Sequence, residues 1–307
     1  MLGALKFSSY CLYGAFVCAV AATILYLVYS VGVFRVRTAR MQTSAGSTIT
    51  TGVTAQRTAG GPVLAGYLAT YMQRSALLFM VGALLFRTIV SKRGPYGNMY
   101  EFSLAFGMTI CLAYYVVSRF YPVKAMGGLA MAAASAIMFY GITRPASEKQ
   151  VAGLIPALQS KWIAIHVPMA MLAYGFFTIG FAAGVLYLIQ ERVRTEKLPS
   201  LDVLDEVGYR ATVVGFPLMF ATLVLGGIWA SEAWGGFWTW DPKETSALVT
   251  WLIYAFYMHA RVVRGTKGRG TAIILIVGFA ATLFTYYGNY WFTGLHGFVG
   301  PGGLGGD

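Results

Sequence analysis

Charged residues and cysteine are both scarce in this sequence. Only 11% of its 307 residues are charged, whereas roughly 25% is usual for a soluble domain. Hydrophobic residues make up 57%, and they gather in long runs separated by short polar segments. Such runs are typical of transmembrane helices, because a backbone surrounded by lipid must satisfy its own hydrogen bonds. The composition excludes a soluble domain and predicts an all-α polytopic membrane protein.

Cysteine chemistry is not expected. The three cysteines, Cys11, Cys18 and Cys111, lie inside apolar runs, and the sequence contains no CxxC pair. Cysteines in such surroundings usually serve packing, so neither a thiol reaction nor a zinc site is predicted. The sequence also lacks a phosphate-binding loop and a nucleophile elbow, so neither a P-loop nucleotide-binding enzyme nor an α/β-hydrolase is predicted.

The net charge of +12 does not indicate nucleic acid, because the basic residues lie between apolar runs. The lipid bilayer is the expected surrounding. No cleavable signal pattern is visible, and the first apolar run is expected to be retained. We expect about eight transmembrane helices, near residues 8–33, 75–90, 101–120, 125–142, 163–190, 211–229, 245–263 and 271–291.

The distribution of charge predicts the orientation of these spans. The loops on one side carry most of the 23 lysine and arginine residues, and the richer side faces the cytoplasm. Both termini are then on the outer, periplasmic or lumenal, side. The chain is predicted to be a single integral membrane domain, 1–307, with a flexible cytoplasmic loop 34–66, an external tryptophan-rich loop 230–244 and a glycine-rich tail 297–307.

Tryptophan is concentrated just before the seventh predicted span. Trp234, Trp238 and Trp240 precede Asp241, which is followed by a proline and has the spacing of a helix N-cap. An aromatic belt at the headgroups is one interpretation of this cluster. Binding of a flat partner is the other, because Gly235 and Gly236 between the indoles would let the backbone approach it closely.

Histidine is rarer still, and the topology gives each of the three a distinct place. His166 opens the fifth span and His296 follows the eighth, so both lie on the outer side with the tryptophans. His259 lies about 20 Å along the helix that starts near Thr245, past the midplane of a hydrocarbon core about 30 Å thick. Any one of them is commonly an interfacial residue, but an ionisable group inside a span favours function. Two histidines beside tryptophans suit haem, because imidazole binds its iron and indole packs on its ring.

The tryptophan segment WGGFWTWDPKET, 234–245, resembles the WWD signature of the haem-handling proteins of cytochrome c maturation. It is most similar to that of the CcsA (ResC) family of the system II pathway. Four further segments resemble that family in the same order, so that the resemblance covers roughly residues 70 to 298. They are GPYGNMYEF (94–102), HVPMAMLAYGFF (166–177), LIYAFYMHAR (252–261) and NYWFTGLHGF (289–298).

The resemblance implies a cytochrome c haem lyase, or synthase, formed with a CcsB (ResB)-type partner. Haem b would pass from a transmembrane site to an outer site and be joined there to the CxxCH motif of apocytochrome c. His166 and His296 would be the axial ligands of the outer haem, and His259 one ligand of the transmembrane haem, with the second ligand supplied by the partner. The face and edge of the outer haem would be held by Trp234, Gly235, Gly236, Trp238, Trp240 and Asp241.

Three other functions remain open at this point. A haem-handling protein of system I and a haem exporter without synthase activity would need similar ligands. A non-haem structural membrane subunit would tolerate replacement of the histidines. The glycine- and alanine-rich composition favours a cell membrane, with the active face outward, over a thylakoid membrane.

Overall fold

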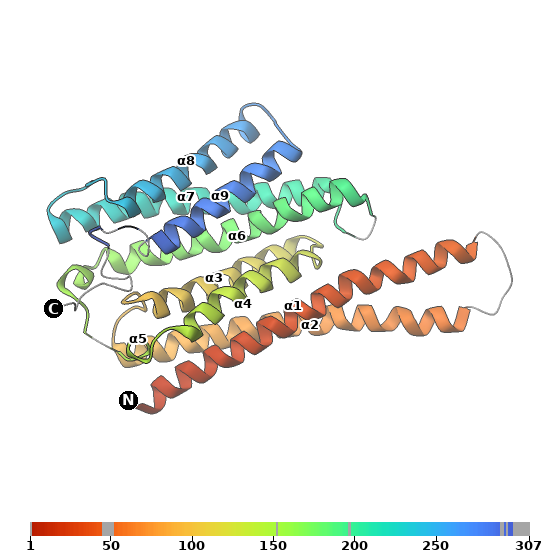
Figure 1. Cartoon of the computed structure of the whole chain (residues 1–307), viewed down its shortest axis with the longest axis horizontal. Helices are drawn as coiled ribbons and strands as arrows, with labels where there is room; N and C mark the ends of the chain where they lie inside the picture. The colour runs from red at the N-terminus through yellow and green to blue at the C-terminus, as the bar shows by residue number, and fades with distance from the viewer. Residues whose placement is uncertain are drawn as a thin grey trace.

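A computed structural model of the chain describes residues 2–44, 52–151, 153–195, 198–288, 292 and 294–296. The predicted glycine-rich tail, 297–307, lies outside these residues. All regular structure in the described part is helical (Figure 1), as the composition predicted. The elements are α1 (Leu2–Ser44), α2 (Gly52–Ser91), α3 (Met99–Phe120), α4 (Met126–Thr143), α5 (Ala146–Lys149), the 3-10 helix η1 (Pro156–Gln159), α6 (Ile163–Val193), α7 (Leu201–Trp234), α8 (Pro242–Val262) and α9 (Arg269–Tyr287).

Each of the eight predicted spans corresponds to one long helix. Seven of these helices in the described chain are long and apolar enough to cross a membrane, namely α1, α2, α3, α4, α6, α7 and α9. The chain is therefore a multi-pass membrane protein. The remaining helix, α8, is more polar because it carries Lys243, Glu244, His259 and Arg261.

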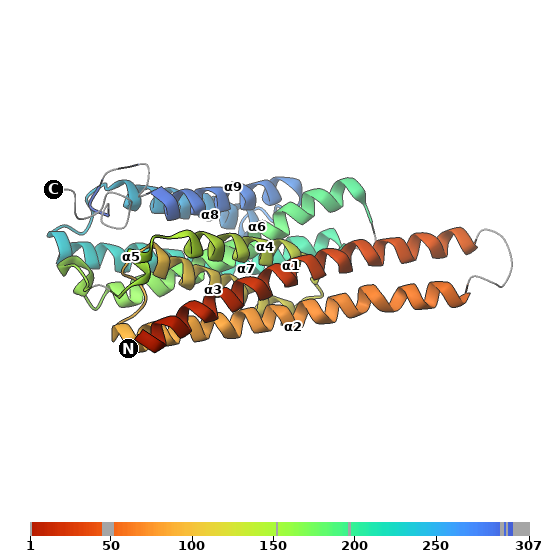
Figure 2. The ribbon, with the colours of Figure 1, turned by 60° about the horizontal axis from the view of Figure 1, so that its bottom comes forward.

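Most of the segment predicted to be a flexible loop, 34–66, is helical in the structure, and its flexibility stays a prediction. α1 continues to Ser44 and α2 begins at Gly52, and residues 45–51 lie outside the described part of the chain. Figure 2 shows the two helices running side by side beyond the rest of the bundle. The helices extend beyond the spans because nucleation, the unfavourable step, has already taken place there. Extending a helix into arginine, alanine and methionine, which are good helix formers, then costs little free energy.

Close approach of α1 to α2 depends on a glycine where the pair leaves the bundle. A Cβ atom on Gly32 would lie 2.6 Å from Cγ of Pro62, well inside contact distance. A glycine also allows close approach of α6 to α3: a Cβ on Gly175 of α6 would lie 2.7 Å from the carbonyl oxygen of Thr109 in α3. Small residues at such crossings let membrane helices pack backbone to backbone.

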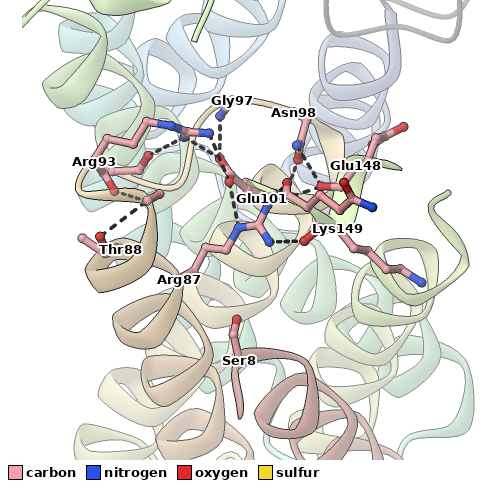
Figure 3. A network of polar contacts seen from close by, with 12 residues as sticks. Ser8, Arg87, Thr88, Arg93, Gly97, Asn98, Glu101, Glu148 and Lys149 are labelled. Carbon is pink, nitrogen blue, oxygen red and sulfur yellow. Dashed lines mark hydrogen bonds and ion pairs between the residues drawn. The ribbon is translucent and has the colours of Figure 1, made fainter. Parts of the chain in front are cut away.

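A buried ionic network fixes the connections at the end of the bundle where α3, α6 and α8 begin (Figure 3). The carboxylate of Glu101 accepts from Arg87 Nε and from an Arg93 guanidinium nitrogen, both at 2.8 Å, and from the backbone of Gly97 at 2.7 Å. Arg87 also donates to the carbonyl oxygen of Gln150, at 2.8 Å. The network therefore ties the α2–α3 connection to the segment that leads from α5 toward α6.

Candidate functional site

Two of the three histidines converge on one cavity at this end of the bundle. His166 lies in the first turn of α6, and His296 follows α9. Both side chains line the same partly open cavity. Residues of η1, α3, α7, α8 and α9 complete its wall. The structure therefore brings His166 and His296 to one cavity, and their pairing on a haem iron remains a prediction.

The imidazole of His166 is held by the backbone of α7. Its Nδ1 lies 2.9 Å from the carbonyl oxygen of Thr222. A carbonyl can only accept, so Nδ1 carries the proton and Nε2 is the basic nitrogen. Gly226, one turn further along α7, allows this approach, because a Cβ there would lie 2.9 Å from Cε1 of the imidazole.

A carboxylate holds His296 in the same way. Nδ1 of His296 lies 2.8 Å from Oδ1 of Asp241. Asp241 is the N-cap of α8, as predicted, and accepts at Oδ1 from the N–H of Lys243 at 2.9 Å. Its Oδ2 accepts from the N–H of Leu295 at 2.6 Å. Asp241 therefore joins the start of α8 to the segment after α9.

The charges of this pair follow from burial and hydrogen bonding. Burial raises the pKa of Asp241, but the hydrogen bond and charge of His296, together with the two backbone donors, outweigh it and lower that pKa to about 2. Burial lowers the pKa of His296, and the hydrogen bond that it donates to Asp241 opposes this only in part. Near neutral pH the pair is a carboxylate and a neutral imidazole, with Nε2 of His296 as the basic nitrogen.

A buried tryptophan that the sequence analysis did not assign to the site packs against both histidines. The ring of Trp229, in α7, lies 6.1 Å from that of His166 and 5.4 Å from that of His296. Its Nε1 donates to the carbonyl oxygen of Ala157 at 2.7 Å. Trp234 stands edge-on to both Trp229 and His296, at 4.7 and 5.0 Å. Trp229 and Trp234 thus support one side of the His296 ring.

The other predicted tryptophans occupy different surroundings. Trp238 lines the cavity. Trp240 is 70% exposed and touches Trp238 edge-on at 5.7 Å, and it is not among the residues that line the cavity. Direct contact of Trp240 with a ligand in this cavity remains a prediction.

The predicted boundaries of the tryptophan-rich loop, 230–244, need correction. Helix α7 continues to Trp234 and α8 begins at Pro242, so the connection is only 235–241. Gly235 caps α7 in the left-handed region, at φ 78°, where glycine avoids the strain of a side chain. That local role explains Gly235 without a ligand. A Cβ on Gly236 would meet Thr239 Cγ2 at an ordinary 3.5 Å, so binding by these glycines also remains a prediction.

His259 lies apart from the cavity. It is exposed in the last turns of α8, on the same side as Leu252 and Phe256, which are 51% and 62% exposed. These two apolar side chains line a shallow groove between α8 and α9. The structure thus brings together His166 and His296, and it leaves His259 on an outward face.

Fold and site together define a multi-pass helical membrane protein with a paired-histidine, tryptophan-lined cavity at one end.

The family model described as "Cytochrome C assembly protein" matches residues 71–296. The cytochrome c biogenesis protein CcsA of Chlamydomonas reinhardtii is 37% identical over 230 residues, covering 72% of this chain and 65% of that protein. CcsA of Trieres chinensis is 32% identical over 270 residues, covering 76% and 86%. CcsA of Synechococcus elongatus is 32% identical over 258 residues, covering 66% and 78%.

This chain belongs to the cytochrome c assembly protein family and, within it, to the CcsA proteins. The resemblance first seen in the tryptophan segment is thereby confirmed. Among solved structures, the cytochrome c haem lyase CcmF superposes with a TM-score of 0.61 at 19% identity. The superposition covers 92% of this chain and 46% of CcmF, so it shows a shared fold. Membership of the family places the chain in cytochrome c maturation.

Proposed function

We propose that the chain is the haem-handling subunit of a cytochrome c synthase. The observation that carries the proposal is the pair of imidazoles, each held at Nδ1, that line one aromatic cavity. Holding Nδ1–H on an acceptor makes Nε2 the ligating nitrogen and raises its basicity. Two such nitrogens suit the axial positions of haem iron. Trp229, Trp234 and Trp238 suit the aromatic surroundings of a porphyrin.

The bound haem b would be a substrate. Its two vinyl groups supply the carbons that become thioethers. At each vinyl a cysteine thiol of the CxxCH motif adds: a C–S bond forms, and the thiol hydrogen passes to the terminal carbon of the vinyl. Holding the ring still beside the thiols lowers the barrier by proximity. The histidine of CxxCH would then displace His166 or His296 and so release the product.

His259 is proposed as one ligand of a second, transmembrane haem. Its exposed position beside the apolar groove of α8 and α9 supports a site completed by another chain. The second ligand would come from a CcsB (ResB)-type partner. We expect His259→Ala to leave the outer site loaded when haem is added directly, and to prevent loading when haem must arrive through the membrane.

We propose the orientation of the chain and its membrane from the distribution of charge and from the organisms of its relatives. The distribution of lysine and arginine supports an outer position for the cavity end. Relatives occur in a green alga and in a cyanobacterium, which makes a thylakoid membrane as good a location as a cell membrane. In either case the cavity would face the compartment in which apocytochrome c is matured.

Absorption spectra of the detergent-purified protein, oxidised and reduced, test the outer site. We expect a sharp low-spin haem spectrum in the wild-type protein and its loss in a His166→Ala, His296→Ala double variant. Added imidazole should restore part of it. Reconstitution with the partner and a CxxCH peptide, followed by mass measurement of covalently bound haem, separates a synthase from an exporter. Normal cytochrome c maturation by the double variant, without imidazole, would refute the proposal.

A further inference from the structure

One amino group in the cavity wall has no part in holding the two imidazoles. Lys243 lies in the first turn of α8 and lines the cavity with His166 and His296. Its backbone N–H donates to Asp241. In the described part of the chain, its ammonium group forms no ion pair.

Asp241 and Glu244, the two acidic residues next to Lys243 in the sequence, form no ion pair with its ammonium group in the described structure. Both oxygens of Asp241 accept from His296 or from backbone donors. Oε2 of Glu244 accepts from the N–H and the hydroxyl of Thr239, at 2.8 and 3.1 Å. Its Oε1 is buried without a partner in the described structure, so the ammonium group of Lys243 does not reach it. Because the ammonium group of Lys243 forms no ion pair with Glu244, it remains available to bind an anion in the cavity.

The positive charge of Lys243 is felt at the histidine pair. Burial is the main cause of the lowered pKa of His296, and the charge of Lys243 acts in the same direction. Lys243 also stands at the N-terminus of α8, where the unsatisfied N–H groups add partial positive charge. Lys243 is thus the cationic side chain of this wall, and the carboxylates of Asp241 and Glu244 act on His296 in the opposite direction.

We propose that Lys243 binds a carboxylate of the porphyrin substrate and so fixes which edge of the ring faces α8. This inference rests on the proposed function, because it presumes iron held between His166 and His296. Two axial bonds alone leave the ring able to rotate about the line through the iron. The carboxylates of haem b lie on one edge of the ring and the vinyl groups are turned away from them. A charged contact at Lys243 would set that rotation and direct the vinyl groups away from α8.

Titration with two porphyrins isolates this contact. Ligand-free full-length protein in detergent is titrated with iron protoporphyrin and with its dimethyl ester, which keeps the iron and the vinyl groups but has no anionic carboxylate. The variants are Lys243→Met, which keeps length without charge, and Lys243→Arg, which keeps charge. Lys161→Met is the matched control, because Lys161 is exposed at the same end of the bundle and does not line the cavity.

We expect the wild-type protein and Lys161→Met to bind the diacid about 10- to 100-fold more tightly than the ester, as one charge-assisted hydrogen bond implies. Lys243→Met should bind both equally, and Lys243→Arg should keep part of the preference. A preference unchanged in Lys243→Met, or none in the wild type, would overturn the assignment while low-spin spectra still supported the paired histidines. Loss of low-spin binding for both porphyrins in every protein would instead overturn the proposed function, and this inference with it.

Discussion

Nδ1 of His296 and Oδ1 of Asp241 lie 2.8 Å apart, although 55 positions separate the two residues in the sequence. The same carboxylate caps α8 through Lys243 and holds the N–H of Leu295. One side chain therefore sets where α8 starts, where the segment after α9 returns, and which nitrogen of the imidazole carries the proton. Such a carboxylate–histidine pair is the usual support of a metal-binding imidazole.

Replacing Asp241 by Asn should weaken haem binding by about 10- to 100-fold, the usual effect of losing such a support. The amide can still accept from one backbone N–H. Its NH2 group, if it faces His296, moves the imidazole proton to Nε2 and removes the ligating lone pair. The dissociation constant for haem, measured by absorption titration, checks this. Asp202→Asn, an exposed change at the start of α7, is the control, and equal affinities for both variants would contradict the prediction.

The stability of the ligand-free protein should fall as pH drops below 6.5. Burial lowers the pKa of His296 from its ordinary value of 6.5. The unfolded chain therefore takes up a proton first, and stability is lost as pH falls from 6.5 toward the lowered pKa. Asp241 stays ionised in this window, because its pKa is about 2 and the stability it contributes disappears only below 3.8. His296→Gln should show a shallower loss in thermal unfolding between about pH 6.5 and pH 5; an unchanged slope would contradict this.

Much of the site was accessible from the sequence because its signals are local. The Asp–Pro–x–Glu order predicted the N-cap of α8, and the alternation of spans predicted that His166 and His296 would meet at one end. The order of motifs also identified the family. These inferences need only helix-start chemistry and the fact that each span reverses the side of the membrane.

The parts that the sequence did not reveal depend on which side of a long helix faces inward. α7 is apolar along most of its length, so nothing local distinguishes Trp229, which packs on both histidines, from a lipid-facing residue. Its five-residue spacing from Trp234 corresponds to about 140° around the helix, so helical periodicity does not predict that the two indoles meet. Trp240 belongs to the same tryptophan segment, but its side chain is exposed. The backbone has a positive φ of 59° at this residue and turns there. Tertiary packing decides both cases.

Gly226→Ala should weaken haem binding although it ought to stabilise an isolated helix. Alanine in a helix interior is favoured over glycine by about 0.5–1 kcal/mol. At this position, however, the new Cβ would lie 2.9 Å from Cε1 of His166, and the ring must shift by several tenths of an ångström. That shift strains its hydrogen bond to Thr222 and moves the ligating nitrogen. Gly61→Ala in α2, where a Cβ would meet nothing within 4 Å, should leave haem affinity unchanged; equal affinities for both variants would count against the assigned geometry.

Arg87→Met should destabilise the protein by about 3–5 kcal/mol, the usual cost of breaking a buried ion pair. Arg87 is 1% exposed and its partner Glu101 is fully buried. The variant leaves that carboxylate with Arg93 as its remaining cation. It also removes the hydrogen bond that Arg87 donates to the carbonyl oxygen of Gln150. The measurement is the free energy of unfolding in detergent.

Arg210→Met is the matched control for this network. Arg210 pairs with Glu206 at 2.6 Å, but its side chain is 60% exposed, and such surface pairs contribute about 0–1 kcal/mol. The cavity adds a second readout, because Met99 and Phe102 in its wall flank Glu101 along α3. Arg87→Met, which breaks the network, should therefore lower both haem affinity and stability. Arg210→Met should lower neither. Loss of stability with full affinity would mean that the ionic network holds the connections together without shaping the cavity.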